Sequence, residues 1–206
     1  MGGAHADTTS AVLAALAAAA FAAGGVSLVW VHFLPTGNRP VVDAVSDYGA
    51  GPYRLFYRVT VISLGLGALL LLVALARGTG VASGGLIWLG VYAVSRVAIA
   101  FFPTDLPGAP VTPVGRVHLV LAAAAFTAIA FAAADLTPSL ADEPGWGASG
   151  LLGILRWAVV ITAVGTLLTR VVAQLRPWFG LVERLLYAAS VAFLIAVAVE
   201  AVRVLG

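Results

Sequence analysis

The sequence predicts an all-α, polytopic membrane protein: a six-helix transmembrane bundle that forms a single transmembrane domain over residues 1–206. The mean hydropathy is +1.06, and 62% of the residues are hydrophobic while only 10% are charged. A water-soluble domain carries about 25% charged residues, so a soluble fold could not hide this apolar surface. Six apolar segments also reach the ~20 residues that a helix needs to cross a bilayer.

The six predicted spans follow one another with short connections. Gly51 and Pro52 can open the second span, Gly78 and Gly80 make a tight turn after it, and Thr112 before a proline is typical of a helix N-cap. Five glycines are expected to let helix backbones approach closely, namely Gly65, Gly67, Gly84, Gly85 and Gly90. The predicted spans are residues 10–34, 55–76, 82–102, 114–136, 151–173 and 181–204.

The charged residues divide unevenly between the two sides that an even number of spans defines. The side of loops 35–54, 103–113 and 174–180 carries eight arginines against four acidic residues, a net charge of +4; the other side carries three arginines against five acidic residues, a net charge of −2. The excess of arginine predicts that the first side faces the cytoplasm of a prokaryotic inner membrane and that both termini face outward.

Composition excludes several classes of function. The chain has no cysteine, which excludes disulfides, thiol catalysis and cysteine-bound metals. All 11 basic residues are arginine, which excludes a lysine Schiff base. A net charge of +2 gives no basis for binding nucleic acid. Membrane lipids are the expected partners, and a homo-oligomer or a larger membrane complex remains open.

Polar residues near the arginine-rich side form the candidate site. Arg96 is expected about two turns inside its helix, where a buried charge needs a partner or water. Arginine side chains bind carboxylates and phosphates with two parallel hydrogen bonds. The predicted ligand site is an arginine- and histidine-lined pocket for an anionic lipid or amphiphile, and its candidate residues are His32, Arg54, Arg58, Arg96, Arg116, His118, Arg170 and Arg184, supported by Asp47, Asp105 and Glu183.

Other chemistries are weighed against this prediction. A zinc hydrolase would take its ligands from His32, Asp47, Asp105 and His118, although these lie in four separate segments. His32 and His118 are also the only pair placed to ligate a haem. Ser46 beside Asp47 lacks the motif of an activated nucleophile and favours a turn. For Glu183 and Arg184, a loop clamp with Arg176 or Asp105 is expected at least as much as a contact with a ligand. We expect no cofactor and leave enzymatic activity open; a small transporter or a structural subunit is a further alternative.

Short motifs at the arginine-rich side carry a family resemblance. They are His32 to Pro35, Ser46-Asp47-Tyr48, Phe102 to Asp105, the run Thr112, Gly115 and His118, and the group Gly180, Glu183 and Arg184. In these motifs the chain resembles the "domain of unknown function 998" family of small multi-pass bacterial and archaeal membrane proteins. The resemblance covers nearly the whole chain. It implies a membrane bundle and no established activity.

Overall fold

The chain folds into helices joined by turns and irregular loops over residues 8–81 and 84–206, which are the residues that the computed structural model describes. This confirms the predicted all-α membrane bundle. Two short 3-10 helices, η1 and η2, interrupt the connections. The elements are α1 (Thr8–Val31), η1 (Val45–Ala50), α2 (Arg54–Gly78), α3 (Gly84–Ile99), α4 (Pro113–Ala141), α5 (Ser149–Val171), η2 (Ala173–Trp178) and α6 (Phe179–Leu205).

Helix lengths fit a membrane for five of the six helices, while α3 is shorter. Its 16 residues extend about 24 Å at 1.5 Å per residue, against a hydrocarbon core of ~30 Å. The predicted span ran to residue 102, whereas α3 ends at Ile99 because residues 100–102 form turns. Arg96 therefore lies within the last turn of α3, which corrects the expected depth of two turns. Residues 82 and 83 of that predicted span, and Asp7 of the charge count, lie outside the described residues.

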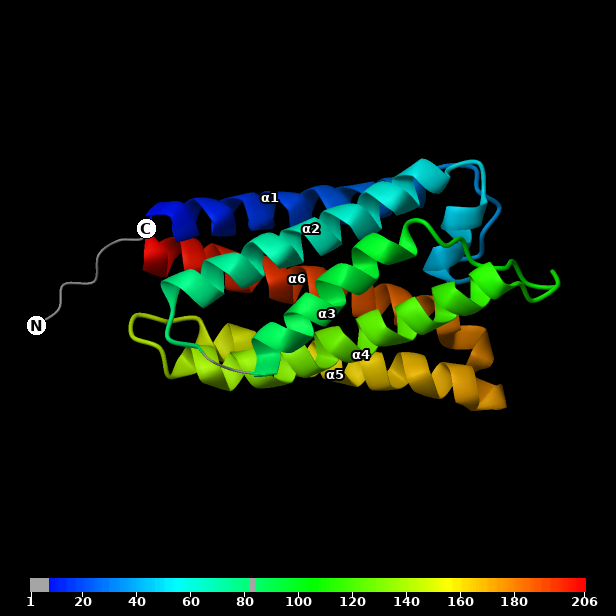
Figure 1. Ribbon diagram of the computed structural model, residues 1–206. Helices are drawn as coiled ribbons and strands as arrows, with labels where there is room; N and C mark the ends of the chain where they lie inside the picture. Colours follow the sequence, from blue (N-terminus) through cyan, green and yellow to red (C-terminus); the bar gives the residue numbers. More distant parts are fainter. Residues whose placement is uncertain (1–7, 82–83) are drawn as a thin grey trace, which may run out of the picture.

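The helices pack in chain order into a closed ring. Each helix packs against the next one along the chain, and α6 returns to pack against α1 and also touches α2. The start of α1 and the end of α6 lie at one end of the bundle. The loop that holds η1, the α3–α4 loop and η2 all lie at the other end (Figure 1). We call the latter the arginine-rich end.

The core and the outer surface are both apolar, as expected of a bundle whose solvent is lipid. The centre of the ring contains fully buried residues such as Phe21, Leu64, Leu71 and Phe193. Small residues bring helices together: a β-carbon at Gly65 would lie 2.8 Å from the carbonyl oxygen of Ala93 in α3. Large apolar side chains remain exposed around the ring, including Val26, Trp30, Phe33, Leu55, Ile87, Val120, Ile154, Ile161 and Trp178.

Acidic side chains at the opposite end satisfy backbone donors where helices begin. Asp135 accepts a hydrogen bond from the amide of Gly85 in the first turn of α3. Glu200 accepts from the amides of Gly147 and Ala148 at 2.7 and 3.2 Å, and it also pairs with Arg203. Helix-start amides without an intrahelical partner are costly to leave unsatisfied at a membrane, so these acids are accounted for by the fold.

The topology can be tested directly because the chain has no cysteine to remove. Single cysteines at Arg39, Ala109 and Gln174 should react with a membrane-impermeant maleimide from one side of the membrane, and a cysteine at Asp142 only from the other side. The reason is the placement of the three loops at the arginine-rich end. Labelling of Ala109→Cys and Asp142→Cys from the same side would contradict the arrangement.

Candidate functional site

Arg184 fastens the first loop to the start of α6. Its guanidinium donates hydrogen bonds to the Nε2 atom of His32 at 2.7 Å, the carbonyl oxygens of Asp43 and Gly180 at 2.8 and 2.9 Å, and the hydroxyl of Tyr48 at 3.1 Å. The Nδ1 atom of His32 lies 2.6 Å from the carbonyl oxygen of Leu28, so Nδ1 carries the proton and Nε2 accepts. Arg184 therefore uses four of its five N–H donors within the fold.

Two neighbours of Arg184 complete this attachment, which we call the α6 clamp (Gly180, Glu183 and Arg184 with His32, Asp43, Val45 and Tyr48). Oε2 of Glu183 accepts the amide of Val45 at 2.7 Å. A β-carbon at Gly180 would overlap the carbonyl oxygens of Pro40 and Asp43, so only glycine permits this approach. Glu183 and Arg184 do form a loop clamp, but Arg176 and Asp105 are not its partners. The correct partners are in the first loop because that loop folds over the start of α6.

Asp47 and Asp43 serve the backbone of the same loop. Asp47 is buried and accepts the amide of Ala44 at 3.1 Å, while burial raises the pKa of its carboxyl group. Asp43 accepts the amide of Arg39 at 2.7 Å, and this hydrogen bond lowers its pKa. Both carboxylates therefore shape the first loop.

A second attachment, the α4 clamp (Phe102, Asp105, Thr112, Gly115 and His118), holds the α3–α4 loop on the start of α4. Asp105 accepts hydrogen bonds from the amide and the hydroxyl of Thr112, both at 2.8 Å. The hydrogen bond from the amide lowers the pKa of the Asp105 carboxyl group. Thr112 in turn caps α4 by accepting the amide of Gly115 at 3.0 Å. A side chain at Gly115 would overlap the Asp105 carboxylate. The Nδ1 atom of His118 lies 2.6 Å from the carbonyl oxygen of Phe102.

Arg96 lies in an aromatic cage inside the bundle and is 1% exposed. Its guanidinium donates to the hydroxyl of Tyr187 at 2.7 Å. The guanidinium carbon lies 4.6 to 5.2 Å from the ring centres of Tyr187, Phe126 and Tyr92. Cation–π contacts of this kind offset part of the cost of burying the charge. Arg96 thus joins α3, α4 and α6 and contributes to neither of the two cavities described next.

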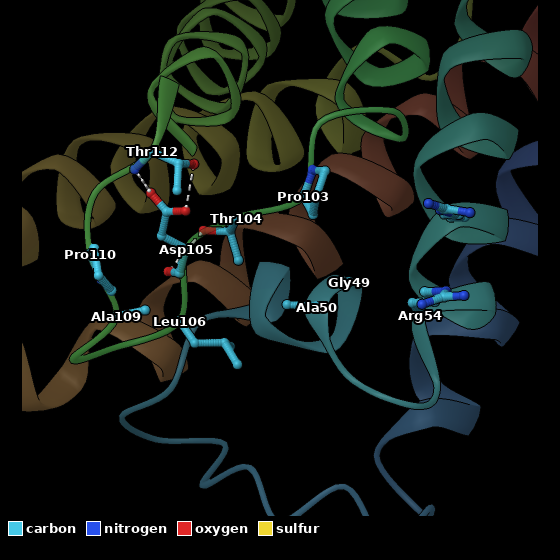
Figure 2. Close-up of a pocket in the computed structure, with 11 residues that line it drawn as sticks. Gly49, Ala50, Arg54, Pro103, Thr104, Asp105, Leu106, Ala109, Pro110 and Thr112 are labelled. Carbon is cyan, nitrogen blue, oxygen red and sulfur yellow. Dashed lines mark hydrogen bonds between the residues drawn. The ribbon is translucent and has the colours of Figure 1, made fainter. Parts of the chain in front are cut away.

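A loop pocket opens at the arginine-rich end between η1, the start of α2 and the α3–α4 loop (Figure 2). Its volume is about 500 Å³. Arg54 lies across the pocket from Asp105 and Thr112, whose hydrogen bonds are drawn in Figure 2. Arg58, one turn after Arg54, also lines it, and both arginines are exposed. The lining consists of Gly49, Ala50, Arg54, Arg58, Pro103, Thr104, Asp105, Leu106, Ala109, Pro110 and Thr112.

A larger interhelical cavity lies between α4 and α5 and reaches the start of α6. Its volume is about 710 Å³. Most of its wall is apolar, and the lining residues Leu119, Phe131, Val164 and Leu167 are each more than half exposed, so protein does not close it off. The lining is Ser46, Thr104, His118, Leu119, Ala122, Ala123, Phe126, Thr127, Ala130, Phe131, Ala134, Val160, Ala163, Val164, Thr166, Leu167, Arg170, Phe179 and Glu183.

One end of the interhelical cavity is polar, and three of its groups retain bonding capacity. The Arg170 guanidinium lies 4.3 Å over the Phe179 ring and has no hydrogen-bond acceptor or carboxylate partner among the described residues. His118 uses Nδ1 in the α4 clamp, which leaves Nε2. Glu183 uses Oε2 in the α6 clamp, which leaves Oε1. The cavity therefore joins a long apolar wall to a cation, an imidazole nitrogen and a carboxylate oxygen.

The predicted site residues are thus distributed over several places rather than gathered in one arginine-lined pocket. His118, Arg170 and Glu183 line the interhelical cavity, while Arg54, Arg58 and Asp105 line the loop pocket. Arg184, His32 and Asp47 hold the first loop, and Arg96 is in the aromatic cage. Arg116 is exposed and lines neither space.

The four residues of the zinc alternative are engaged in separate contacts: His32 belongs to the α6 clamp, Asp105 and His118 to the α4 clamp, and Asp47 accepts the Ala44 amide of the first loop. Both nitrogens of His32 are engaged, by the Leu28 carbonyl and by Arg184. No group of three or more histidine, aspartate or glutamate side chains in residues 8–81 and 84–206 is arranged to hold a metal ion. The geometry therefore gives no support to the metal-dependent alternative or to a haem between His32 and His118.

The apolar wall of the interhelical cavity was not predicted from the sequence. On α4 the lining follows two stripes of four-residue spacing, one through Ala122, Phe126, Ala130 and Ala134 and the other through Leu119, Ala123, Thr127 and Phe131. Such spacing places residues on one helix face. His118 begins the first stripe, so its small alanines were the available signal for a hollow beside a polar group.

The aromatic cage predicts an energetic coupling between Tyr187 and Arg96. Tyr187→Phe removes the hydroxyl that accepts from the buried guanidinium and should lower the free energy of unfolding by about 1–3 kcal/mol. In an Arg96→Met background the same change should cost less than ~0.5 kcal/mol, because the charge is gone. Denaturation in mixed micelles measures both. Equal losses in the two backgrounds would show that Tyr187 does not serve Arg96.

The α6 clamp predicts a pH dependence of stability. Burial lowers the pKa of His32, with Arg184 adding to the effect, against the opposing hydrogen bond to Leu28. The folded chain thus favours neutral His32, whose contribution is complete above the ordinary pKa of ~6.5 and is lost as the pH falls through the lower folded-state value. Thermal unfolding in detergent should show destabilisation on acidification. His32→Gln, which keeps an acceptor for Arg184 and does not titrate, should flatten this dependence; an unchanged profile would contradict it.

Comparison with known proteins places the chain in a family. No curated protein and no solved structure matches it. The profile of one family, described as "Protein of unknown function (DUF998)", matches residues 15–200. That range includes every residue of the two clamps, and both of the resemblance motifs on α4 and α6 lie within it. The chain is a multi-pass membrane protein that belongs to the DUF998 family of proteins of unknown function.

Proposed function

We propose that this protein binds a membrane lipid or related amphiphile that carries an anionic group, with the tail in the interhelical cavity and the head at its polar end. One observation carries the proposal: a cavity of about 710 Å³ has an apolar wall along α4 and α5 and an unpaired arginine at one end. This arrangement matches the two parts of an amphiphile.

The apolar wall fits an acyl chain and not a soluble metabolite. Alanines of α4 leave the space, and exposed side chains such as Leu119 and Leu167 border it. Moving an acyl chain from surrounding lipid into this cavity gains little hydrophobic free energy, since both surroundings are apolar. The tail therefore supports retention weakly, and selection depends on the head.

The head contacts are Arg170 and His118. The Arg170 guanidinium can donate two parallel hydrogen bonds to a phosphate or carboxylate, and hydrogen bonds to charged groups contribute about 1.5–3 kcal/mol each. His118 presents Nε2, because its Nδ1 is held by the Phe102 carbonyl. Arg170 lies at the end of α5, one residue before its last residue, Val171. This position is at the level expected for lipid headgroups.

The membrane concerned is proposed to be the cell membrane, with the arginine-rich end in the cytoplasm. The three loops at that end and the adjacent helix ends carry most of the arginines, which the positive-inside rule assigns to the cytoplasmic side. The lipid would then be held in the inner leaflet.

The head contact can be tested by lipid retention. Protein purified in mild detergent should retain phospholipid, measured by mass spectrometry of extracted lipid. Arg170→Gln should reduce retention at least about tenfold, because loss of even one charged hydrogen bond of about 1.5 kcal/mol is roughly tenfold in affinity. Arg116→Gln is the matched control: Arg116 is exposed near the same end and lines neither cavity, so retention should not change. Equal retention in Arg170→Gln and the wild type would overturn the proposal.

The tail position is tested by filling the cavity. Ala130→Trp places a large ring in the wall and should displace the chain, while Val120→Trp, on the exposed outside of α4, should not. Loss of lipid in both variants would indicate damage to α4 instead of occupation of the cavity.

A further inference from the structure

We propose that the head of this lipid carries a primary ammonium group together with its phosphate, and that Glu183 binds the ammonium while Arg170 binds the phosphate. This inference rests on the proposed function and names the class of headgroup. It follows from a pair of opposite charges that line one cavity without pairing with each other.

Arg170 and Glu183 carry opposite charges. Both line the polar end of the interhelical cavity. No ion pair within 4.0 Å joins them or joins Arg170 to any other carboxylate in the described part of the chain. Opposite charges in an apolar setting attract strongly. The α6 clamp holds Glu183 through its Oε2 atom, while the exposed Arg170 lies over the Phe179 ring, so the two charges line one cavity without forming an ion pair.

The carboxylate of Glu183 is buried and has one oxygen without a hydrogen bond among the described residues. Glu183 is 3% exposed, and the amide of Val45 fixes its Oε2 atom at 2.7 Å. Oε1 receives no hydrogen bond from the described residues. A buried carboxylate needs donors or a cation to offset its lost hydration. In the cavity, a ligand group that is cationic or rich in N–H bonds meets this need.

A purely anionic headgroup does not suit a site that also contains the Glu183 carboxylate. A phosphate bound at Arg170 with no positive group would bring a second negative charge beside Glu183, and like charges repel. A phosphate diester with a primary ammonium is neutral overall, as are Arg170 and Glu183 taken together. Such a zwitterion can place its negative part toward Arg170 and its N–H donors toward Oε1. A quaternary ammonium has no N–H group to donate and is expected to bind less well.

The experiment uses the full chain in nanodiscs that contain equal amounts of phosphatidylethanolamine, phosphatidylcholine and phosphatidylglycerol with identical acyl chains. Native mass spectrometry then measures the lipid that stays bound after release from the disc. The wild type should enrich phosphatidylethanolamine about tenfold over the other two lipids. The same measurement with the N-monomethyl and N,N-dimethyl derivatives should show enrichment that falls with each N–H removed, and phosphatidylcholine, the quaternary member of the series, should bind least.

Two variants separate the charges. Glu183→Gln keeps an oxygen for the Val45 amide but loses the negative charge, so the preference for phosphatidylethanolamine over phosphatidylglycerol should disappear while lipid is still retained. Glu200→Gln, a carboxylate at the opposite end of the bundle, should keep the preference. A melting curve in detergent verifies that Glu183→Gln is folded, and the methylation series tests the inference on the unmutated protein if it is not.

The outcomes distinguish this inference from the proposed function. Equal binding of the three lipids by the wild type, together with loss of all three in Arg170→Gln, would overturn the ammonium assignment and leave lipid binding in place. Unchanged lipid in Arg170→Gln would overturn both. A preference that survives in Glu183→Gln would show that another group recognises the ammonium and would overturn the role of Glu183.

Discussion

The attachment of the first loop to α6 is the constraint on which the arginine-rich end depends. Arg184 alone makes hydrogen bonds to four groups, and Glu183 adds the amide of Val45. These bonds fix η1, which contributes Gly49 and Ala50 to the loop pocket and Ser46 to the interhelical cavity. Without this clamp both spaces would lose the part of their lining that η1 supplies. The shape of both sites therefore depends on α6, although most of their lining belongs to other helices.

The two clamps explain why conspicuous polar residues can be poor guides to a binding site. Arg184, Asp105 and Asp47 each satisfy backbone or side-chain groups of loops that lie against the membrane, where an unpaired polar group is costly. The fold uses both oxygens of Asp105, one oxygen of Asp47 and four of the five N–H donors of Arg184. In the lining of the interhelical cavity, three groups keep unused donors or acceptors: the guanidinium of Arg170, Nε2 of His118 and Oε1 of Glu183. The candidate function was inferred from this remainder.

Much of the fold was predictable, because lipid imposes simple rules of length and composition. Apolar runs gave the helices, and the Thr112 cap gave the start of α4 as the structure has it. The end of α3 was less predictable, since residues 100–102 are apolar but form turns. Hydropathy cannot distinguish a helical turn from a tight turn when both are apolar. The depth assigned to Arg96 was wrong for that reason.

The site was only partly predictable, for a different physical reason. Sequence placed His32, His118, Arg170 and Arg184 at one end, but it could not show which donors and acceptors the loops would use. Whether Arg184 faces a ligand or the Asp43 carbonyl depends on how loop 32–53 folds over α6, a contact between residues about 140 positions apart. Arg54 and Arg58, by contrast, share a lining because helical spacing alone places them on one face.

The size of the interhelical cavity bears on what occupies it. In a tightly packed core, an unfilled cavity costs about 24 cal/mol per Å³. A volume of about 710 Å³ enclosed by protein and left empty would cost about 17 kcal/mol at that rate, comparable with the whole net stability of a folded domain; this cavity is open at its side, so material from the membrane can enter it. Water is a poor filler, because each water molecule needs two to four polar partners and the wall along α4 offers almost none. An acyl chain fills such a space without that requirement. The alanine stripe of α4 is therefore compatible with a stable bundle when lipid completes the packing, and the polar end then selects which lipid does so.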